Sequence, residues 1–138
     1  MIDDFRGEFH HQLDDKSRLS IPRKFATRIK SEEEGRVVLT RGIDSCIWVY
    51  PHSLFDKLFE QIKGFSLFDP NAQRFLNTFF SGTHEDTLDK ASRIIIPKSL
   101  KDYANITKDV VLVGSVGRIQ LWSLENWEQH LTDNKDNK

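Results

Sequence analysis

The stretch LDDKSRLSIPRKF, residues 13–25, decides the fold because it occurs a second time as LDKASRIIIPKSL, residues 88–100. Six of the 13 positions carry the same residue, namely Leu, Asp, Ser, Arg, Ile and Pro, at a constant offset of 75. An internal repeat constrains the architecture before any local propensity does. Two copies are too few for a solenoid, so the sequence predicts a pseudo-two-fold domain with two equivalent functional places.

The duplication extends beyond this stretch. Downstream, VVLT (37–40) matches VVLV (110–113) at offset 73, and CIWVYPHSLF (46–55) matches RIQLWSLENW (118–127) at offset 72. The falling offset indicates small loop deletions inside two copies of one unit. We therefore expect four segments: a first repeat at 1–63, a connecting helix at 64–81, a second repeat at 82–131 and a polar tail at 132–138.

Each copy has the same predicted order of elements. An alternating segment at residues 9–13 predicts a strand, the polar turn DDKS follows, and RLSIP predicts a second short strand. Proline ends that strand and can occupy the first turn of a helix, where its missing N–H costs nothing. This helix should reach about Ser31 in the first copy and Ala104 in the second. Paired strands should follow at residues 36–40, 46–50, 110–114 and 118–122.

Further helices are expected after these strands. Apolar residues at helical spacing follow Pro51 and recur at residues 124–131. Between the copies, the sequence predicts an additional helix after Pro70, with an apolar stripe formed by Phe75, Leu76, Phe79 and Phe80. The expected class is α+β, with helices packed on one side of short antiparallel strands.

Composition restricts the class of protein. A chain of 138 residues with 38% hydrophobic residues forms one ordinary domain, or two half-domains that cannot bury a core separately. No apolar run approaches the roughly 18 residues of a membrane span, and the N-terminus lacks a signal-peptide core. Cys46 is the only cysteine, which excludes a disulfide framework and a Cys-based zinc site. We expect a cytoplasmic protein.

Charge is informative only locally. The net charge of −1 gives no general argument for a nucleic-acid partner. Residues 14–28, however, carry five Lys or Arg against two Asp, and residues 89–101 carry four against one, so each segment is +3. If the fold brings the two segments together, they present a basic surface suited to a polyanion.

The repeated motif is L-D-x-x-S-R-x-x-I-P. Asp14 and Asp89 precede the turn, where a carboxylate accepts hydrogen bonds from turn amides, so a structural role is the first expectation for both. Ser17 and Ser92 also belong to the turn. An arginine follows each aspartate by four residues, and a role in the turn alone does not account for it.

Arg18 and Arg93 stay in register although the residues between Asp and Arg drift. A surface ion pair, worth ~0–1 kcal/mol, explains one such arginine but explains two poorly. Contact with phosphates or base edges suits the planar five-donor guanidinium better. The flanking cations are either a solvated face or phosphate contacts. These cations are Lys16, Lys90, Arg23, Lys24 and Lys98.

Signatures of catalysis are weak. His10 and His11 are adjacent and would face opposite sides of a strand, and His84-Glu85 lacks the second histidine of a zinc helix motif. Neither a nucleophile elbow nor a phosphate-loop G-K-[ST] occurs. We expect no metal, no cofactor, no small-molecule substrate and no enzymatic activity.

The motifs together resemble those of the MraZ family of bacterial transcriptional regulators. The resemblance rests on FRGEF (5–9), the two D-x-x-x-R motifs that end in I-P, VVLVG (110–114) and WSLENW (122–127). A single motif would be weak, because AbrB-like and antitoxin domains share it. The resemblance implies a double swapped-hairpin, AbrB-like fold and closed-ring homo-oligomers. It also implies binding to short direct repeats in double-stranded DNA upstream of the division and cell-wall gene cluster, including the regulator's own promoter.

One departure concerns the turn. The family often has glycine before the arginine, where this chain has Ser17 and Ser92. Serine tolerates a positive φ poorly, so the turn is expected to differ in shape.

The sequence thus predicts a nucleoid-associated DNA-binding regulator that works by occupancy and binds itself, duplex DNA and no membrane. Three alternatives stay open: an antitoxin-like module that binds a toxin protein, a structural ring without a DNA role, and an enzyme. Seven polar residues after position 131 are short for an inhibitory tail, and a structural ring predicts no salt-dependent DNA binding. An enzyme would need an acid/base pair or metal cluster.

Overall fold

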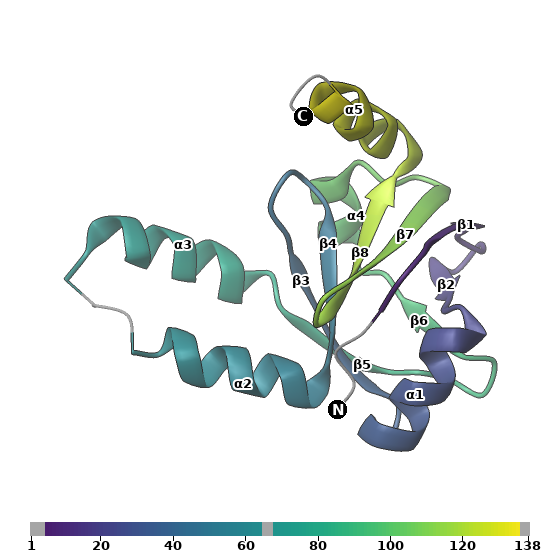
Figure 1. Ribbon diagram of the computed structural model, residues 1–138, viewed down its shortest axis with the longest axis horizontal. Coiled ribbons are helices and arrows are strands. Elements are labelled where there is room, and N and C mark those ends of the chain that lie inside the picture. Colours follow the sequence, from purple (N-terminus) through teal and green to yellow (C-terminus); the bar gives the residue numbers. More distant parts are fainter. Residues whose placement is uncertain (1–4, 65–67, 136–138) are drawn as a thin grey trace.

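The duplicated sequence folds into a duplicated set of elements (Figure 1). The computed structural model describes residues 5–64 and 68–135. The first set is β1 (Glu8–Gln12), β2 (Arg18–Ser20), α1 (Arg23–Glu33), β3 (Arg36–Arg41), β4 (Ile47–Pro51) and α2 (His52–Ile62). After α3 (Pro70–Ser81), the second set is β5 (His84–Thr87), β6 (Arg93–Ile95), α4 (Lys98–Ala104), β7 (Asp109–Ser115), β8 (Arg118–Ser123) and α5 (Leu124–Lys135).

The two repeats exchange their first strands. The main sheet has six antiparallel strands in the order β1-β7-β8-β4-β3-β5, and β2 pairs with β6 in a separate ladder. Thus β1 of the first repeat pairs with β7 of the second, and β5 of the second pairs with β3 of the first. Strands β4 and β8 join the halves at the centre. This confirms the predicted α+β class and the swapped-hairpin arrangement, in which neither repeat completes its own sheet.

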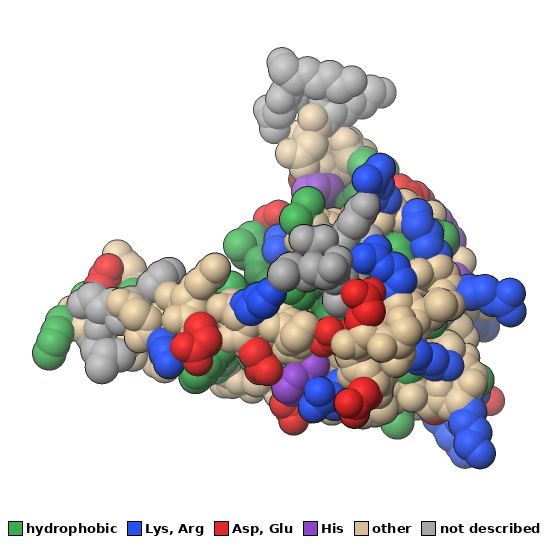
Figure 2. Space-filling model, turned by 60° about the horizontal axis from the view of Figure 1, so that its bottom comes forward, with side chains coloured by type: hydrophobic (Ala, Val, Ile, Leu, Met, Phe, Trp, Pro, Cys, Tyr) green, Lys and Arg blue, Asp and Glu red, His purple; other side chains and the backbone are tan. Residues whose placement is uncertain are grey.

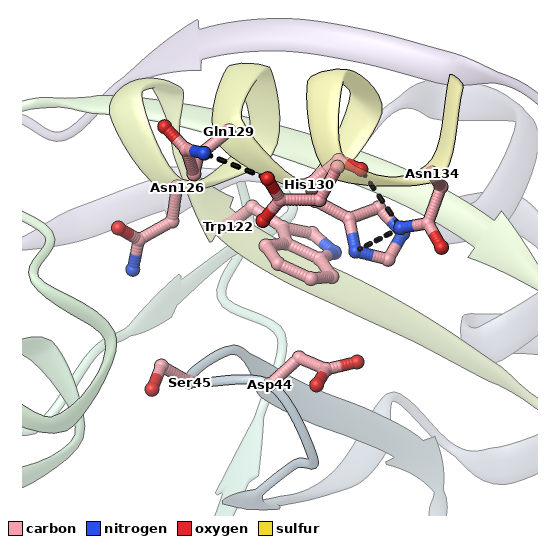
Figure 3. A pocket seen from close by; sticks show the side chains of 8 residues that line it. Asp44, Ser45, Trp122, Asn126, Gln129, His130 and Asn134 are labelled. Carbon is pink, nitrogen blue, oxygen red and sulfur yellow. Dashed lines mark hydrogen bonds between the residues drawn. The ribbon is translucent and has the colours of Figure 1, made fainter. Parts of the chain in front are cut away.

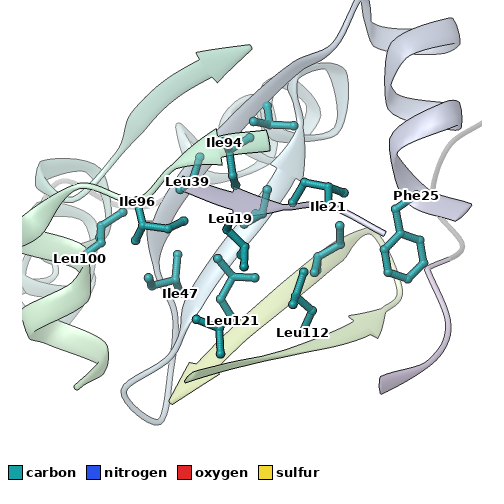
Figure 4. Close-up of a cluster of buried hydrophobic side chains, with 14 of the residues drawn as sticks. Leu19, Ile21, Phe25, Leu39, Ile47, Ile94, Ile96, Leu100, Leu112 and Leu121 are labelled. Carbon is teal, nitrogen blue, oxygen red and sulfur yellow. The ribbon is translucent and has the colours of Figure 1, made fainter. Parts of the chain in front are cut away.

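One face of the sheet is closed by the β2–β6 ladder together with α1 and α4. Leu19 and Ile94 lie opposite each other in the ladder and are almost fully buried. They pack in one cluster with Phe25 of α1, Leu100 of α4 and sheet residues such as Leu112 (Figure 4). Burial of each such side chain contributes roughly 1.5–3 kcal/mol. The ladder is therefore anchored firmly, and its outward face is held in place.

The other face carries an aromatic core, which corrects the expectation that helices cover one side only. In β4, Ile47 and Val49 point into the first cluster, whereas Trp48 and Tyr50 belong to a second one. That second cluster includes Phe79 of α3 and contributions from α2 and α5. A strand that is apolar on both faces needs cover on both faces, and the central strands here have this character.

Element boundaries agree with the sequence expectation within a few residues. Helix α1 runs to Glu33 rather than Ser31, and Glu34 and Gly35 then adopt φ values of 56° and 77°. Helix α3 lies where the stripe after Pro70 predicted it. Helix α5 continues to Lys135 and so enters the segment expected to be a polar tail. Residues 136–138 of that tail lie outside the described residues.

Glu33 joins the end of one helix to the start of another. Its side chain is buried, with Oε1 accepting a hydrogen bond from the Ser53 backbone N–H (2.7 Å) and Oε2 from the Ser53 hydroxyl (2.8 Å). A carboxylate at a helix N-terminus satisfies free N–H groups and complements the helix dipole. Glu33 thereby positions α2, which with α3 projects away from the body of the molecule (Figure 1).

Candidate nucleic-acid interface

The two D-x-x-x-R loops have the same hydrogen-bonding pattern. Asp14 Oδ1 accepts bonds from the backbone N–H groups of Lys16 (2.9 Å) and Arg18 (2.8 Å). Asp89 Oδ1 makes the two equivalent bonds, both at 2.9 Å. Each aspartate therefore organises its turn by binding amides, a common use of Asp in turns. The same pair of hydrogen bonds thus fixes the turn conformation in both copies.

Serine supplies a left-handed residue in both turns. Ser17 has a φ of 60° and Ser92 a φ of 61°. Each backbone N–H donates to the carbonyl of its aspartate, at 3.0 and 2.9 Å. The left-handed region costs an L-residue roughly 1–2 kcal/mol, a cost that glycine avoids. The two copies therefore share one turn shape, and the departure from glycine is accommodated as backbone strain.

The second carboxylate oxygen of each aspartate orients the arginine. Arg18 Nε donates to Asp14 Oδ2 at 2.6 Å, and Arg93 Nε donates to Asp89 Oδ2 at 2.9 Å. The backbone hydrogen bond from the arginine N–H, and then its side chain, lower the pKa of both carboxyls. The arginine side chains are 30% and 31% exposed. Each guanidinium is thus held in one direction and stays accessible.

The β2–β6 ladder brings the two loops together. Arg18 lies opposite Ile95 and Arg93 lies opposite Ser20, at the two ends of a three-residue ladder. Because Leu19 and Ile94 between them face the core, both arginines belong to the outward face. The sequence predicted two equivalent places, and the fold places them side by side.

The flanking cations predicted from sequence surround this outward face. Lys16, Arg23, Lys24, Lys90 and Lys98 are all exposed, and Figure 2 shows Lys and Arg side chains along the side of the molecule where α1 and the loops lie. They are not equally available: Lys98 Nζ binds Asp102 at 2.8 Å.

Sequence reasoning counted Lys101 in the basic segment 89–101 but did not assign it to this site. Its Nζ donates to the Ser17 hydroxyl at 2.6 Å, so α4 of the second repeat supports the loop of the first. Position 101 matches Ala26 in the other copy. The repeat therefore gave no signal for Lys101, and its charge alone resembles an ordinary helix surface.

A pocket of about 440 Å³ lies elsewhere, between α5 and the turn before β4 (Figure 3). His130 packs against the Trp122 ring, with centroids 4.7 Å apart. Asn134 donates to the backbone carbonyl of His130 at 2.8 Å, and Gln129 donates to Asp133 at 2.9 Å. These polar groups near the end of α5 thus bond within the helix, whereas Asn126 donates to the backbone carbonyl of Ala104 at 3.2 Å. Across residues 5–64 and 68–135, no cluster of His, Cys, Asp or Glu suits a metal ion, and no helix is long and apolar enough for a membrane crossing.

Comparison with known proteins gives the family. The family model described as "MraZ protein, putative antitoxin-like" matches twice, at residues 5–78 and 79–138. The chain belongs to the MraZ family. Three relatives each carry the name Transcriptional regulator MraZ. That of Clostridium tetani is 41% identical over 96% of this chain and 90% of its own length. Those of Clostridium acetobutylicum and Moorella thermoacetica are 40% and 38% identical, over 91% and 96% of this chain and 86% and 90% of their own lengths.

Membership of the MraZ family gives the general class of function, which is transcriptional regulation. The two matches of the family model divide the chain between its copies, in agreement with the duplication seen in the sequence and the fold. Each match contains one D-x-x-x-R loop, Asp14 to Arg18 in the first and Asp89 to Arg93 in the second.

Proposed function

We propose that the chain is a sequence-specific DNA-binding regulator whose two D-x-x-x-R loops contact the duplex. The observation that carries this is the shared outward face, on which Arg18 and Arg93 are each oriented by an aspartate. An oriented guanidinium suits bidentate contact with guanine or grip on a phosphate. The exposed cations around it, Lys16, Lys90, Arg23, Lys24 and Lys98, would neutralise phosphates and supply affinity without sequence information.

Several copies of the chain would act together. A chain of net charge −1 gains little from long-range attraction, and each basic segment is only +3. Joining copies in a closed ring raises the effective concentration of each loop at the next site. The projecting α2–α3 pair supports self-association, because Phe59 and Phe75 on it are 45% and 42% exposed. Large aromatic side chains at the surface are enriched in protein interfaces.

The target would be short direct repeats upstream of the division and cell-wall gene cluster, including the chain's own promoter. Identical protomers at a fixed spacing suit tandem sites in the same orientation. Regulation would follow from occupancy, with no catalytic step and no cofactor, in the cytoplasm at the nucleoid. The resemblance to the MraZ family suggests this target, and the names of the relatives support the broader role of transcriptional regulator.

A second candidate comes from the description of the family model, which includes the words antitoxin-like. In that function the exposed face would bind a toxin protein rather than DNA. We favour DNA because cations dominate the face: the two loop segments carry nine Lys or Arg against three Asp.

The decisive experiment is protection of the chain's own upstream region, mapped at nucleotide resolution over a range of salt concentrations. The proposed function predicts protection of evenly spaced short repeats, with affinity falling steeply as salt rises. A double variant, Arg18→Ala with Arg93→Ala, is the control and should give no footprint at the same concentration. Uniform protection without preferred sites would remove sequence specificity, and absence of any protection would favour a protein partner.

A further inference from the structure

Helix α1 and the second loop enclose a groove of about 400 Å³. Its cationic side chains are Arg23 and Lys30 from α1 and Lys90 from the loop, and none of the described residues that line it carries a carboxylate. All three cations are exposed, and none has an ion-pair or hydrogen-bond partner for its side chain within residues 5–64 and 68–135. Three unpaired cations from both repeats thus surround one concave surface.

The pseudo-equivalent surface, between α4 and the first loop, has different chemistry. At the offset of 75, Asp15 replaces Lys90, Asn105 replaces Lys30 and Asp102 replaces Thr27. The counterpart of Arg23 is Lys98, which Asp102 binds at 2.8 Å. Counted over the positions that line the first groove, three cations face two carboxylates here, which gives +1 against +3 for the first groove.

Helix length reinforces the difference. Helix α1 has 11 residues, whereas α4 has seven and ends at Ala104, before the C-cap residue Asn105, whose φ is 61°. Lys30 therefore stands on a part of α1 that has no counterpart in α4. The imbalance follows from the backbone as well as from the residue types.

We infer that the groove between α1 and the second loop is the principal phosphate-binding site of each protomer, and that Lys30 is one of its DNA-contacting residues. The inference rests on the proposed DNA-binding function and deepens it. An unpaired cation releases counterions from DNA when it contacts a phosphate. Lys98 must first break its ion pair with Asp102, so its contact with a phosphate contributes less affinity. A unit with unequal ends also docks on a repeat in one orientation only, which matches the polarity of a direct repeat.

The test compares matched substitutions in the full chain, with duplex DNA that carries its upstream repeats. Arg23→Gln and Lys98→Gln remove pseudo-equivalent cations, and Lys30→Asn introduces the residue that the second copy has. Arg23→Gln and Lys30→Asn should each weaken binding about fivefold or more per engaged protomer near 0.15 M salt, and should lower the log–log salt slope by about 0.9. Lys98→Gln should change affinity less than about twofold. Equal losses for Arg23→Gln and Lys98→Gln would overturn the inference, as would an unchanged slope for Lys30→Asn.

A gain-of-contact variant guards against loss of fold as an explanation. Asp15→Lys gives the first loop the residue that the second has at position 90, and it should tighten binding and steepen the salt slope. An unchanged affinity would contradict the inference. If the wild-type chain does not bind the repeats at all, the proposed function itself is wrong. If binding depends on salt but both grooves contribute equally, only the assignment of a principal site is wrong.

The orientation of each protomer on its DNA repeat can be measured by site-directed cleavage of the DNA. Cys46 is buried, so a DNA-cleaving chelate can be attached selectively to Ser31→Cys, an exposed position next to Lys30 on α1. Cuts should fall at one and the same end of every repeat. Cuts of equal strength at both ends would overturn the single orientation.

Discussion

Arg93 of the second repeat lies 3.8 Å from Asp14 of the first, measured from Nη1 to Oδ2. The same guanidinium binds its own Asp89 through Nε at 2.9 Å. Arg93 therefore bridges two aspartates, whereas Arg18, among residues 5–64 and 68–135, forms an ion pair with Asp14 alone, at 2.6 Å. The pseudo-two-fold relation is broken at this point, and Asp14 carries more of the shared structure than Asp89 does.

Asp14→Ala should lower the melting temperature more than Asp89→Ala. The first change removes a partner from both arginines as well as two turn bonds, and the second leaves Arg93 with Asp14. Thermal unfolding followed by circular dichroism measures both variants under the same conditions. Asp15→Ala, at an exposed neighbouring position, is the matched control and should leave the transition nearly unchanged. Equal effects of Asp14→Ala and Asp89→Ala would argue against the bridging role of Arg93.

The free energy of unfolding should decrease in acid because the aspartates of the two loops become protonated. The pKa values of Asp14 and Asp89 are lowered from 3.8 in the folded chain, first by the backbone N–H of the following arginine. A lowered folded-state pKa gives a contribution that is complete above the unfolded value and is lost as the pH falls through the folded value. Melting temperatures of the wild type and the double variant Asp14→Asn, Asp89→Asn should therefore differ by a constant amount near neutrality and converge below about pH 4. A gap that persists at low pH would show that the loops gain nothing from ionised carboxylates.

Ser92→Gly should stabilise the chain more than Ser17→Gly. Both serines have a positive φ, and glycine removes that strain but gains entropy in the unfolded state, so the net benefit is on the order of 0.5–1 kcal/mol. Only Ser17 also accepts a hydrogen bond from Lys101, at 2.6 Å, and glycine loses it. Urea unfolding gives the free energies. Ser92→Ala keeps the strain and serves as the control, and a gain equal to that of Ser92→Gly would exclude the backbone explanation.

The fold was predictable to the extent that local pattern determines it. The offset of 75 gave the duplicated order of elements, and proline placed the starts of α1 and α4. The cover on both sheet faces was missed because β4 alternates two kinds of apolar residue, Ile47 and Val49 against Trp48 and Tyr50. Periodicity separates polar from apolar positions and cannot separate one apolar face from another.

The site was predictable where the repeat preserved it. Repetition drew attention to Arg18 and Arg93, but it cannot show contacts that differ between the copies. The counterparts of Lys30 and Lys101 in the other copy are Asn105 and Ala26, which carry no charge. A comparison of the two copies therefore could not identify these lysines. Their places depend on strand exchange, which brings α4 to the first loop and α1 to the second.

Arg18→Ala and Arg93→Ala should each weaken DNA binding while the far-UV spectrum is retained. Loss of a bidentate base contact costs about 1–3 kcal/mol per engaged site. Binding is measured by fluorescence anisotropy with the repeats. Arg74→Ala, on the projecting helix α3 and exposed, controls for the general loss of one positive charge. If the double arginine variant binds as the wild type does, the loops have no part in recognition.

DNA binding should require at least two short direct repeats in helical phase. Each basic segment is only +3, so contact with a single repeat is weak, whereas neighbouring protomers present identical loops at a fixed spacing. Insertion of about half a helical turn, ~5 base pairs, between repeats should therefore cost far more than a mismatch inside one repeat. Gel-shift titrations with one, two and phase-shifted repeats measure the differences. Tight binding to a single repeat, or indifference to phase, would contradict cooperation between protomers even if the chain binds DNA.

The same DNA set tests the source of that cooperation. The double variant Phe59→Ser, Phe75→Ser removes two half-exposed aromatic side chains from α2 and α3, far from the loops. If these faces join protomers, light scattering should give a smaller species than for the wild type. Its affinity for one repeat should equal that of the wild type, because the arginines are untouched, and its gain from a second repeat should be lost. A variant that stays assembled at micromolar concentration would place the interface elsewhere. One that becomes monomeric yet keeps the preference for phased repeats would show that the duplex, rather than contact between protomers, couples the sites.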